Sequence, residues 1–129
     1  MKTTIFWATL WVNPGYKHNN DQEQSAKDII SKVWQEQAKK IFETSWIYIS
    51  ASIKDANAVY NMDRWCPEWG EKIAEISGMR NPEFIKDVEK FKQAVLDVLS
   101  LCQEELDQTT TQVEFDDDVE FVYLKRERK

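Results

Sequence analysis

The residues in this chain that could carry chemistry are few, and the most unusual group is the run Trp65-Cys66-Pro67-Glu68-Trp69. Tryptophan offers a large rigid surface with one hydrogen-bond donor, which suits ligand pockets and interfaces. Cys66 would be a reactive thiol if a positive neighbour such as Arg64 favoured the thiolate. Because the chain holds 6 tryptophans, burial of both indoles in the core is the competing and slightly favoured interpretation. We therefore treat Trp65, Cys66 and Trp69 as candidate binding residues.

A row of carboxylates near the C-terminus is the second candidate, and it alternates with apolar residues: Glu114, Asp116, Asp118 and Glu120. In one continuous strand such residues share a face at roughly 7 Å intervals, which forms a ladder. A carboxylate ladder suits a hard cation or a basic protein surface. The spacing lacks the glycine and late glutamate of a calcium-binding loop. A solvated strand face is the favoured alternative.

Catalytic motifs are missing from the sequence. His18 is the one histidine, and no serine or cysteine motif accompanies it. General-base catalysis needs a nucleophile and an orienting group, and a metal site needs several ligands at suitable spacing. No phosphate-binding loop or dinucleotide-binding motif is present either. We predict no catalytic residue, metal or cofactor, and the pattern favours a protein that is not an enzyme without excluding one.

Composition bounds the fold that must position these residues. The chain has 129 residues, with 42% hydrophobic and 31% charged, a balance typical of one globular domain. Only 3 glycines and 3 prolines occur, so most of the chain is expected to be regular structure. We predict a single α+β domain over residues 1–129, with a charged and frayed tail at 125–129.

The opening segment, residues 3–12, is rich in β-branched and aromatic types and is apolar on both of its faces. It therefore predicts a central strand covered on two sides. Two segments carry apolar residues at the helical period, residues 20–43 and 82–107, and predict amphipathic helices. Asn20 or Asp21 is expected to cap the first helix, and Asn81 with Pro82 to open the second, along whose apolar stripe Phe84 and Cys102 lie.

The remaining segments are less regular. Residues 46–53 alternate and predict a half-buried strand, with a turn at 54–57 and a returning strand from 58. Residues 67–79 fit either a short helix opened by Pro67 or a strand over 71–79, and the apolar spacing slightly favours the helix. Residues 112–125 fit one long strand or a hairpin turning at 116–118.

The order of these elements predicts a two-layer, ferredoxin-like βαββαβ sandwich, in which two long helices cover one face of a four-stranded, mainly antiparallel sheet. No family is identified from motifs. Because the first strand is apolar on both faces, the flank that carries Trp7 and Trp11 needs a cover. A partner subunit, a long loop or residues 67–79 would supply it.

Charge and these candidate residues lead to two functional hypotheses. A net charge of −6 repels nucleic acids and anionic membranes and suits a basic partner. The first hypothesis is a small acidic interaction protein that binds a protein partner through the aromatic or acidic residues, such as an inhibitor encoded by a phage or mobile element. The alternative is a small-molecule binding protein or enzyme with a pocket beside the sheet, lined by Trp7, Trp11, Trp46 and Tyr48.

Two further expectations concern assembly and location. A homodimer that pairs two apolar sheet faces is a third, weaker option. The opening apolar run is interrupted by threonines, ends without a cleavage site and is too short to span a bilayer. The 2 cysteines form no paired motif. Together these features predict a cytoplasmic protein with reduced thiols.

Overall fold

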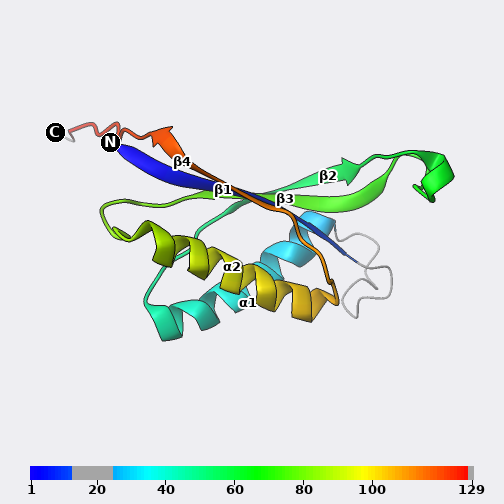
Figure 1. Ribbon diagram of the computed structural model, residues 1–129, viewed down its shortest axis with the longest axis horizontal. Coiled ribbons are helices and arrows are strands. Elements are labelled where there is room, and N and C mark those ends of the chain that lie inside the picture. The colour runs from blue at the N-terminus through cyan, green and yellow to red at the C-terminus, as the bar shows by residue number, and fades with distance from the viewer. Residues whose placement is uncertain (13–24, 128–129) are drawn as a thin grey trace.

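The computed structural model describes residues 1–12 and 25–127. Its elements are β1 (Lys2–Trp11), α1 (Ala26–Ser45), β2 (Ser52–Ala58), the short 3₁₀ helix η1 (Met62–Arg64), β3 (Glu71–Met79), α2 (Val88–Leu106) and β4 (Val113–Glu120). The strands form one antiparallel sheet in the order β2-β3-β1-β4. Both helices lie against the same face of this sheet (Figure 1). This arrangement confirms the predicted ferredoxin-like α+β sandwich.

Strand β1 lies inside the sheet, between β3 and β4, as its apolar sequence predicts. Phe6, Ala8 and Leu10 are buried in the core on the helix side. The opposite side carries Trp7, which is 43% exposed. Within the described residues no helix or strand lies over this side (Figure 1), so residues 67–79 do not supply the predicted cover, and a partner subunit remains a prediction. We call this uncovered side the open face.

Helix α1 follows the predicted apolar stripe and is capped by Ser25. The Ser25 hydroxyl accepts a hydrogen bond from the backbone N–H of Asp28 at 3.3 Å, which satisfies a donor that the helix leaves unpaired. The predicted caps Asn20 and Asp21 lie outside the described residues.

Helix α2 begins later than the sequence predicts. Its cap is Asp87, whose carboxylate accepts from the N–H of Lys90 at 3.1 Å, and residues 81–87 form turns. The Arg80 guanidinium donates to the carbonyl of Ile85 at 2.8 Å and so fixes this non-helical segment. The predicted start at Pro82 is therefore wrong, and Phe84 is largely exposed.

The predicted hairpin between the second and third strands is also wrong in its boundaries. Strand β2 begins at Ser52, so the expected turn at 54–57 lies within a strand, and the chain returns only at Glu71. The long connection 59–70 ends at Gly70, whose φ is +89°. A Cβ at that position would lie 2.6 Å from the carbonyl oxygen of Ala58, so this close approach requires glycine.

The two segments that the sequence leaves open both form strands. Residues 71–79 form β3, whose buried Ala74 and Ile76 pair with β1 on one side and β2 on the other. Residues 113–120 form one strand without a hairpin. Its register with β1 shifts between the pairs Thr3–Val119 and Ile5–Asp116. Between these pairs β1 advances by two residues and β4 by three. This bulge alters which β4 side chains share a face.

Both cysteines, Cys66 and Cys102, are free thiols. Cys102 is fully buried in the core, where burial raises its pKa to about 12, so it behaves as the small hydrophobe that its position predicts.

Neither helix in the described part of the chain is long and apolar enough to cross a bilayer.

Candidate functional site

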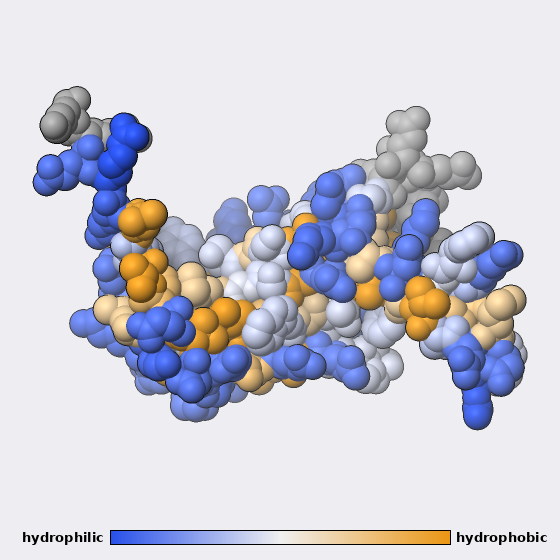
Figure 2. Space-filling model, turned by 90° about the horizontal axis from the view of Figure 1, so that it is seen from above, coloured by the Kyte–Doolittle hydropathy of each residue, from blue (hydrophilic) through white to orange (hydrophobic). Residues whose placement is uncertain are grey.

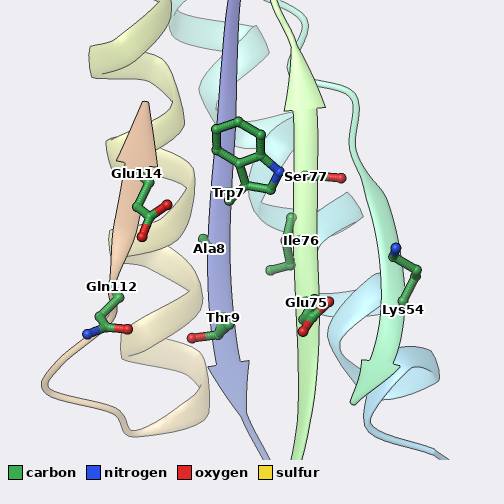
Figure 3. Close-up of a pocket in the computed structure, with 9 residues that line it drawn as sticks. All are labelled: Trp7, Ala8, Thr9, Lys54, Glu75, Ile76, Ser77, Gln112 and Glu114. Carbon is green, nitrogen blue, oxygen red and sulfur yellow. The ribbon is translucent and has the colours of Figure 1, made fainter. Parts of the chain in front are cut away.

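The open face carries a shallow pocket of ≈ 450 Å³ near the middle of the sheet. Figure 3 looks onto the sheet from this side, with the helices behind it. All four strands or their ends contribute to the lining, which comprises Trp7, Ala8, Thr9, Lys54, Glu75, Ile76, Ser77, Gln112 and Glu114. We call this the Trp7 pocket. Trp7 is the one aromatic residue among those that line it.

Strand register explains why charged groups converge there. Glu75 on β3 is paired with Lys54 on β2 and with Thr9 on β1, while Glu114 on β4 is paired with Trp7. Directly paired residues in an antiparallel sheet project from the same face. Two carboxylates and one ammonium group therefore project from the same face as Trp7 and line the same pocket, with Glu114 directly opposite the indole-bearing residue. This balance favours a ligand that combines positive charge with a planar group, because cations are attracted to carboxylates and to aromatic faces.

A second group, the Glu71 cluster, lies where the sheet ends. The hydroxyl of Tyr60 donates to Oε1 of Glu71 at 2.6 Å, and the indole Nε1–H of Trp11 donates to Oε2 at 2.9 Å. Each oxygen of the carboxylate thus receives a hydrogen bond from a different aromatic side chain. Donors on both oxygens fix the orientation of the carboxylate. The cluster is a negative charge held in a defined place.

The Tyr60 hydroxyl remains a donor at physiological pH. The hydrogen bond to Glu71, followed by burial and the negative charge of Glu71, raises the pKa of Tyr60 to about 12. Ionised tyrosine would place a second negative charge against the carboxylate, which is why ionisation is disfavoured.

Three separate elements bring the Glu71 cluster together. Glu71 is the first residue of β3 and pairs with Ala58, the last residue of β2. Trp11 is the last residue of β1 and pairs with Ile73. Tyr60 lies two residues after the end of β2, in the connection 59–70. The ladder pairing therefore places Glu71 and Trp11 at one end of the sheet, and the fold of the connection brings Tyr60 to them.

Cys66 supports this arrangement from within the connection 59–70. Its side chain is buried, and its sulfur accepts a hydrogen bond from the backbone N–H of Tyr60 at 3.4 Å. The thiol also lies 3.4 Å from the carbonyl oxygen of Pro67. Cys66 thus has a structural role, because its sulfur holds the backbone of Tyr60.

The Trp7 pocket and the Glu71 cluster share one strip of the sheet. Glu71, Ile73 and Glu75 are alternate residues of β3, so the Cα atoms of the two glutamates are roughly 13 Å apart along the strand. Figure 2 looks onto this side and shows hydrophilic and hydrophobic residues intermixed across it. We call the two groups together the open-face site.

Among the predicted binding residues, Trp7, Trp11 and Glu114 lie in the open-face site. Trp46 and Tyr48 do not, because they follow α1 and pack on Phe42, with ring centroids 5.5 Å and 4.1 Å away. The pocket that the sequence predicts from all four aromatic residues is therefore wrong in half of its lining.

Trp65 and Trp69 are 88% and 82% exposed, so the slightly favoured expectation that they are buried is wrong. Both sit in the connection 59–70, which projects beyond the helices (Figure 1). Each has a left-handed backbone, with φ of 67° and 72°. Their role in binding remains a prediction.

The acidic row is divided by the bulge in β4, so it does not form the single predicted ladder. Asp116 pairs with Ile5 on the open face, whereas Lys2 forms ion pairs with Asp118 at 3.1 Å and with Glu120 at 3.6 Å. The bulge at Asp117 adds one residue to β4, so the side chains before it and after it do not alternate in the same phase.

Sequence reasoning missed Tyr60, Glu71, Glu75 and Lys54. A signal for the glutamates was present, because a strand over 71–79 places Glu71 and Glu75 on one face. Tyr60 gave no signal, since its partner depends on how the connection 59–70 folds. Within residues 1–12 and 25–127 no cluster of three or more histidine, cysteine or acidic side chains could hold a metal ion.

Comparison with known proteins identifies a family. The SAM lyase family model matches residues 1–125. A solved structure of a phage SAM lyase in complex with S-methyl-5′-thioadenosine is similar in fold, with a TM-score of 0.53 and 14% identity over 89% of this chain and 81% of that chain. A de novo designed protein, Foldit4, gives a TM-score of 0.43 and 10% identity over 92% and 98% of the two chains. No curated protein sequence matches.

These matches overturn the first functional hypothesis. A family of lyases is a family of enzymes, so the prediction of a protein-binding inhibitor is wrong. The sequence misled because it carries none of the short catalytic motifs that we searched for. The match favours the alternative hypothesis, a small-molecule binding protein or enzyme.

Proposed function

The chain belongs to the SAM lyase family, and from that premise we propose that it cleaves S-adenosylmethionine (SAM) and releases S-methyl-5′-thioadenosine. The observation that carries this proposal is the family match over residues 1–125. The nucleoside bound to the phage enzyme of similar fold supports the same product. The open-face site supports it independently, since its charge and aromatic character suit a sulfonium nucleoside.

The reaction requires one bond of the substrate to break. When the bond between the sulfonium sulfur and the aminocarboxypropyl group breaks, both electrons go to sulfur, which becomes a neutral thioether. A lyase adds no water, so the carbon that leaves sulfur must form a new bond within its own fragment. It does so either by closing onto its own carboxylate oxygen or by losing a neighbouring proton to form a double bond. Both routes release the same S-methyl-5′-thioadenosine.

The substrate carries a positive sulfonium beside a planar adenine. The open-face site presents the carboxylates of Glu71, Glu75 and Glu114 with the indole of Trp7. Carboxylates and aromatic faces both attract a cation, and an indole also stacks on a planar base. We assign Glu71 the role of the fixed negative charge, because both of its oxygens are held by donors.

The charge of the substrate disappears during the reaction, which separates binding from catalysis. A carboxylate that attracts the sulfonium stabilises the substrate more than the transition state, in which that charge is partly lost. Such contacts lower KM without raising kcat. We therefore assign the exposed carboxylates Glu75 and Glu114 to substrate capture, and the Glu71 cluster, held by two donors, to orientation of the reacting groups.

The test is direct measurement of the nucleoside product. Purified protein is incubated with SAM, and S-methyl-5′-thioadenosine is quantified by liquid chromatography with mass spectrometry. We expect product to form in proportion to protein, and Glu71→Gln to lower kcat/KM at least tenfold. Glu36→Gln, at an exposed position of α1, is the matched control and should retain activity. Intact SAM after prolonged incubation with folded protein would refute the proposal.

A further inference from the structure

We infer that Gln108 is a positioning residue that holds Trp11, and through it Glu71, in the geometry of the open-face site. The activity part of this inference rests on the proposed function, whereas its structural part does not. The starting observation is that, among residues 1–12 and 25–127, no strand pairs with the end of β1 on its β4 side. The pairing of β1 with β4 ends at Ala8 and Val113, but its pairing with β3 continues to Trp11 and Ile73.

Gln108 occupies the place of the missing strand beside Trp11. Its Oε1 accepts a hydrogen bond from the backbone N–H of Trp11 at 3.3 Å, and its Nε2 donates to the carbonyl oxygen of the same residue. A carboxamide offers one acceptor and N–H donors, as a peptide group does, and so it can replace a partner strand. The final backbone groups of β1 are thereby satisfied without β4.

The end of α2 fixes Gln108 itself. Asp107 ends the helix with a left-handed backbone, φ 54°, and the N–H of Gln108 donates to the carbonyl of Gln103 at 2.8 Å. This closure is a common way to end a helix, and it orients the residue that follows. The carboxamide of Gln108 is therefore presented to β1 by a rigid element.

The consequence for the site lies in the side chain of Trp11. Its indole reaches across to Glu71 over 2.9 Å, a bond that depends on where the backbone of Trp11 lies. A terminal strand residue without a partner on one side frays easily. Loss of the Gln108 amide would therefore release the indole and leave Glu71 held by Tyr60 alone. Gln108 is expected to act on the reaction while touching no substrate.

A double-mutant cycle distinguishes positioning from general support. We propose to measure kcat/KM for wild type, Gln108→Leu, Trp11→Phe and the double variant, with Gln35→Leu, at an exposed position of α1, as the matched control. We expect Gln108→Leu to lower kcat/KM about tenfold, as loss of two hydrogen bonds of ordinary strength suggests. In the Trp11→Phe background the same change should have less than about a twofold effect, because coupled residues are not additive.

An NMR measurement tests the structural part without any activity. The indole N–H signal of Trp11 is the one that Trp11→Phe removes. We expect Glu71→Gln and Gln108→Leu both to shift this signal, and Gln35→Leu to leave it unchanged. If Gln108→Leu fails to fold, Gln108→Glu retains the acceptor but removes the donor to the Trp11 carbonyl, and the same shift is expected.

The outcomes separate the two proposals. If wild type releases no S-methyl-5′-thioadenosine, the proposed function fails, and the Trp11 signal alone decides the role of Gln108. An unchanged Trp11 signal in a folded Gln108 variant would overturn the inference. Equal losses of kcat/KM with and without the Trp11 indole would overturn it too, because they would show that Gln108 acts by another route.

Discussion

Tyr60 and Glu71 form a short hydrogen bond at the exposed end of the sheet, in which the tyrosine hydroxyl is the donor and the carboxylate the acceptor. The pKa of Tyr60 is raised to about 12, chiefly by this bond. A raised pKa means that the bond stabilises the fold fully below the ordinary tyrosine pKa of about 10, and that this contribution is lost as pH rises through about 12. The donor is therefore present throughout the physiological range.

Removing this donor should lower activity by a factor that does not vary with pH. In Tyr60→Phe the aromatic ring remains but Glu71 loses the bond to Oε1, so we expect kcat/KM to fall by about fivefold to twentyfold. The measurement is a rate profile of both proteins between about pH 6 and 9, where Tyr60 does not titrate. A ratio of the two rates that changes across this range would show that Tyr60 itself gains or loses a proton in the reaction.

Glu75 and Glu114 should affect substrate capture rather than turnover. We expect Glu75→Gln and Glu114→Gln each to raise KM for SAM about threefold to tenfold with kcat within about twofold, because the attraction acts on the substrate's charge. S-adenosylhomocysteine, which has a neutral sulfur, should bind more weakly than SAM, and its affinity should change less in these variants. Calorimetry on wild type and variants compares the ligands. Equal losses for both ligands would contradict a role in charge recognition.

At the scale of elements, the sequence predicts those parts whose pattern is local. Both helices follow from periodic apolar residues that bury one stripe against the core, and β1 follows from its run of β-branched and aromatic residues, of which one face is buried. The boundaries of β2 and β3 could not be predicted in this way. Lys54, Asp55 and Asn57 resemble a turn by composition, yet pairing with β3 keeps them in a strand. Tertiary pairing here overrides local preference.

The candidate site was predictable to the extent that it lies on β1. Trp7 and Trp11 were found because alternation in a strand places them on one face. Glu71 and Tyr60 were not found, because they meet only after the connection 59–70 closes. The conformation of this connection depends on residues with positive φ, Gly70 among them, and on the buried thiol of Cys66, and neither feature indicates in the sequence which residue Tyr60 will contact.

Gly70 gives a direct test of that connection. Gly70→Ala would place a Cβ within 2.6 Å of the Ala58 carbonyl oxygen at a φ of +89°, so we expect the free energy of unfolding to fall by about 1–3 kcal/mol. We also expect reduced kcat/KM, because Tyr60 and Glu71 flank this connection. Denaturant unfolding checks the first effect, with Asn57→Ala as an exposed control in the same hairpin. Unchanged stability in Gly70→Ala would show that the turn is not strained by a side chain.

In the molecule as a whole, the two faces of the sheet have different roles: one contributes to the core and the other carries the candidate site. The helix side contains the core, including Phe6, Phe91 and Trp34, whose rings pack together at centroid distances near 6 Å. The open face carries the charged and aromatic groups of the site. Substitutions on the open face are therefore expected to change activity with little loss of stability, which makes the site accessible to mutation. The strands β1 and β3 connect the two sides, since alternate residues of each serve the core and the site.

Strand β4 is tied to the helix layer by one polar contact that can be tested by pH. Asp117, in the β4 bulge, accepts from Lys92 of α2 at 2.7 Å and from the hydroxyl of Thr4 at 3.2 Å. The bond to Lys92 is the largest cause of a lowered Asp117 pKa, and Thr4 and Arg80 lower it further. A lowered carboxylate pKa means stability that is present above the ordinary aspartate pKa of about 4 and is lost as pH falls through the folded value.

Asp117→Asn should therefore destabilise the fold only where the carboxylate is charged. We expect its thermal midpoint to lie below that of wild type at pH 7, and this difference to shrink as pH falls below about 4, because protonated aspartic acid and asparagine are both neutral. Asp97→Asn on α2, whose carboxylate accepts a hydrogen bond from its helix neighbour Gln93, is the comparison variant. If the Asp117→Asn difference stayed constant with pH, the amide would be disturbing the bulge by its shape, and the charge would not be what joins β4 to α2.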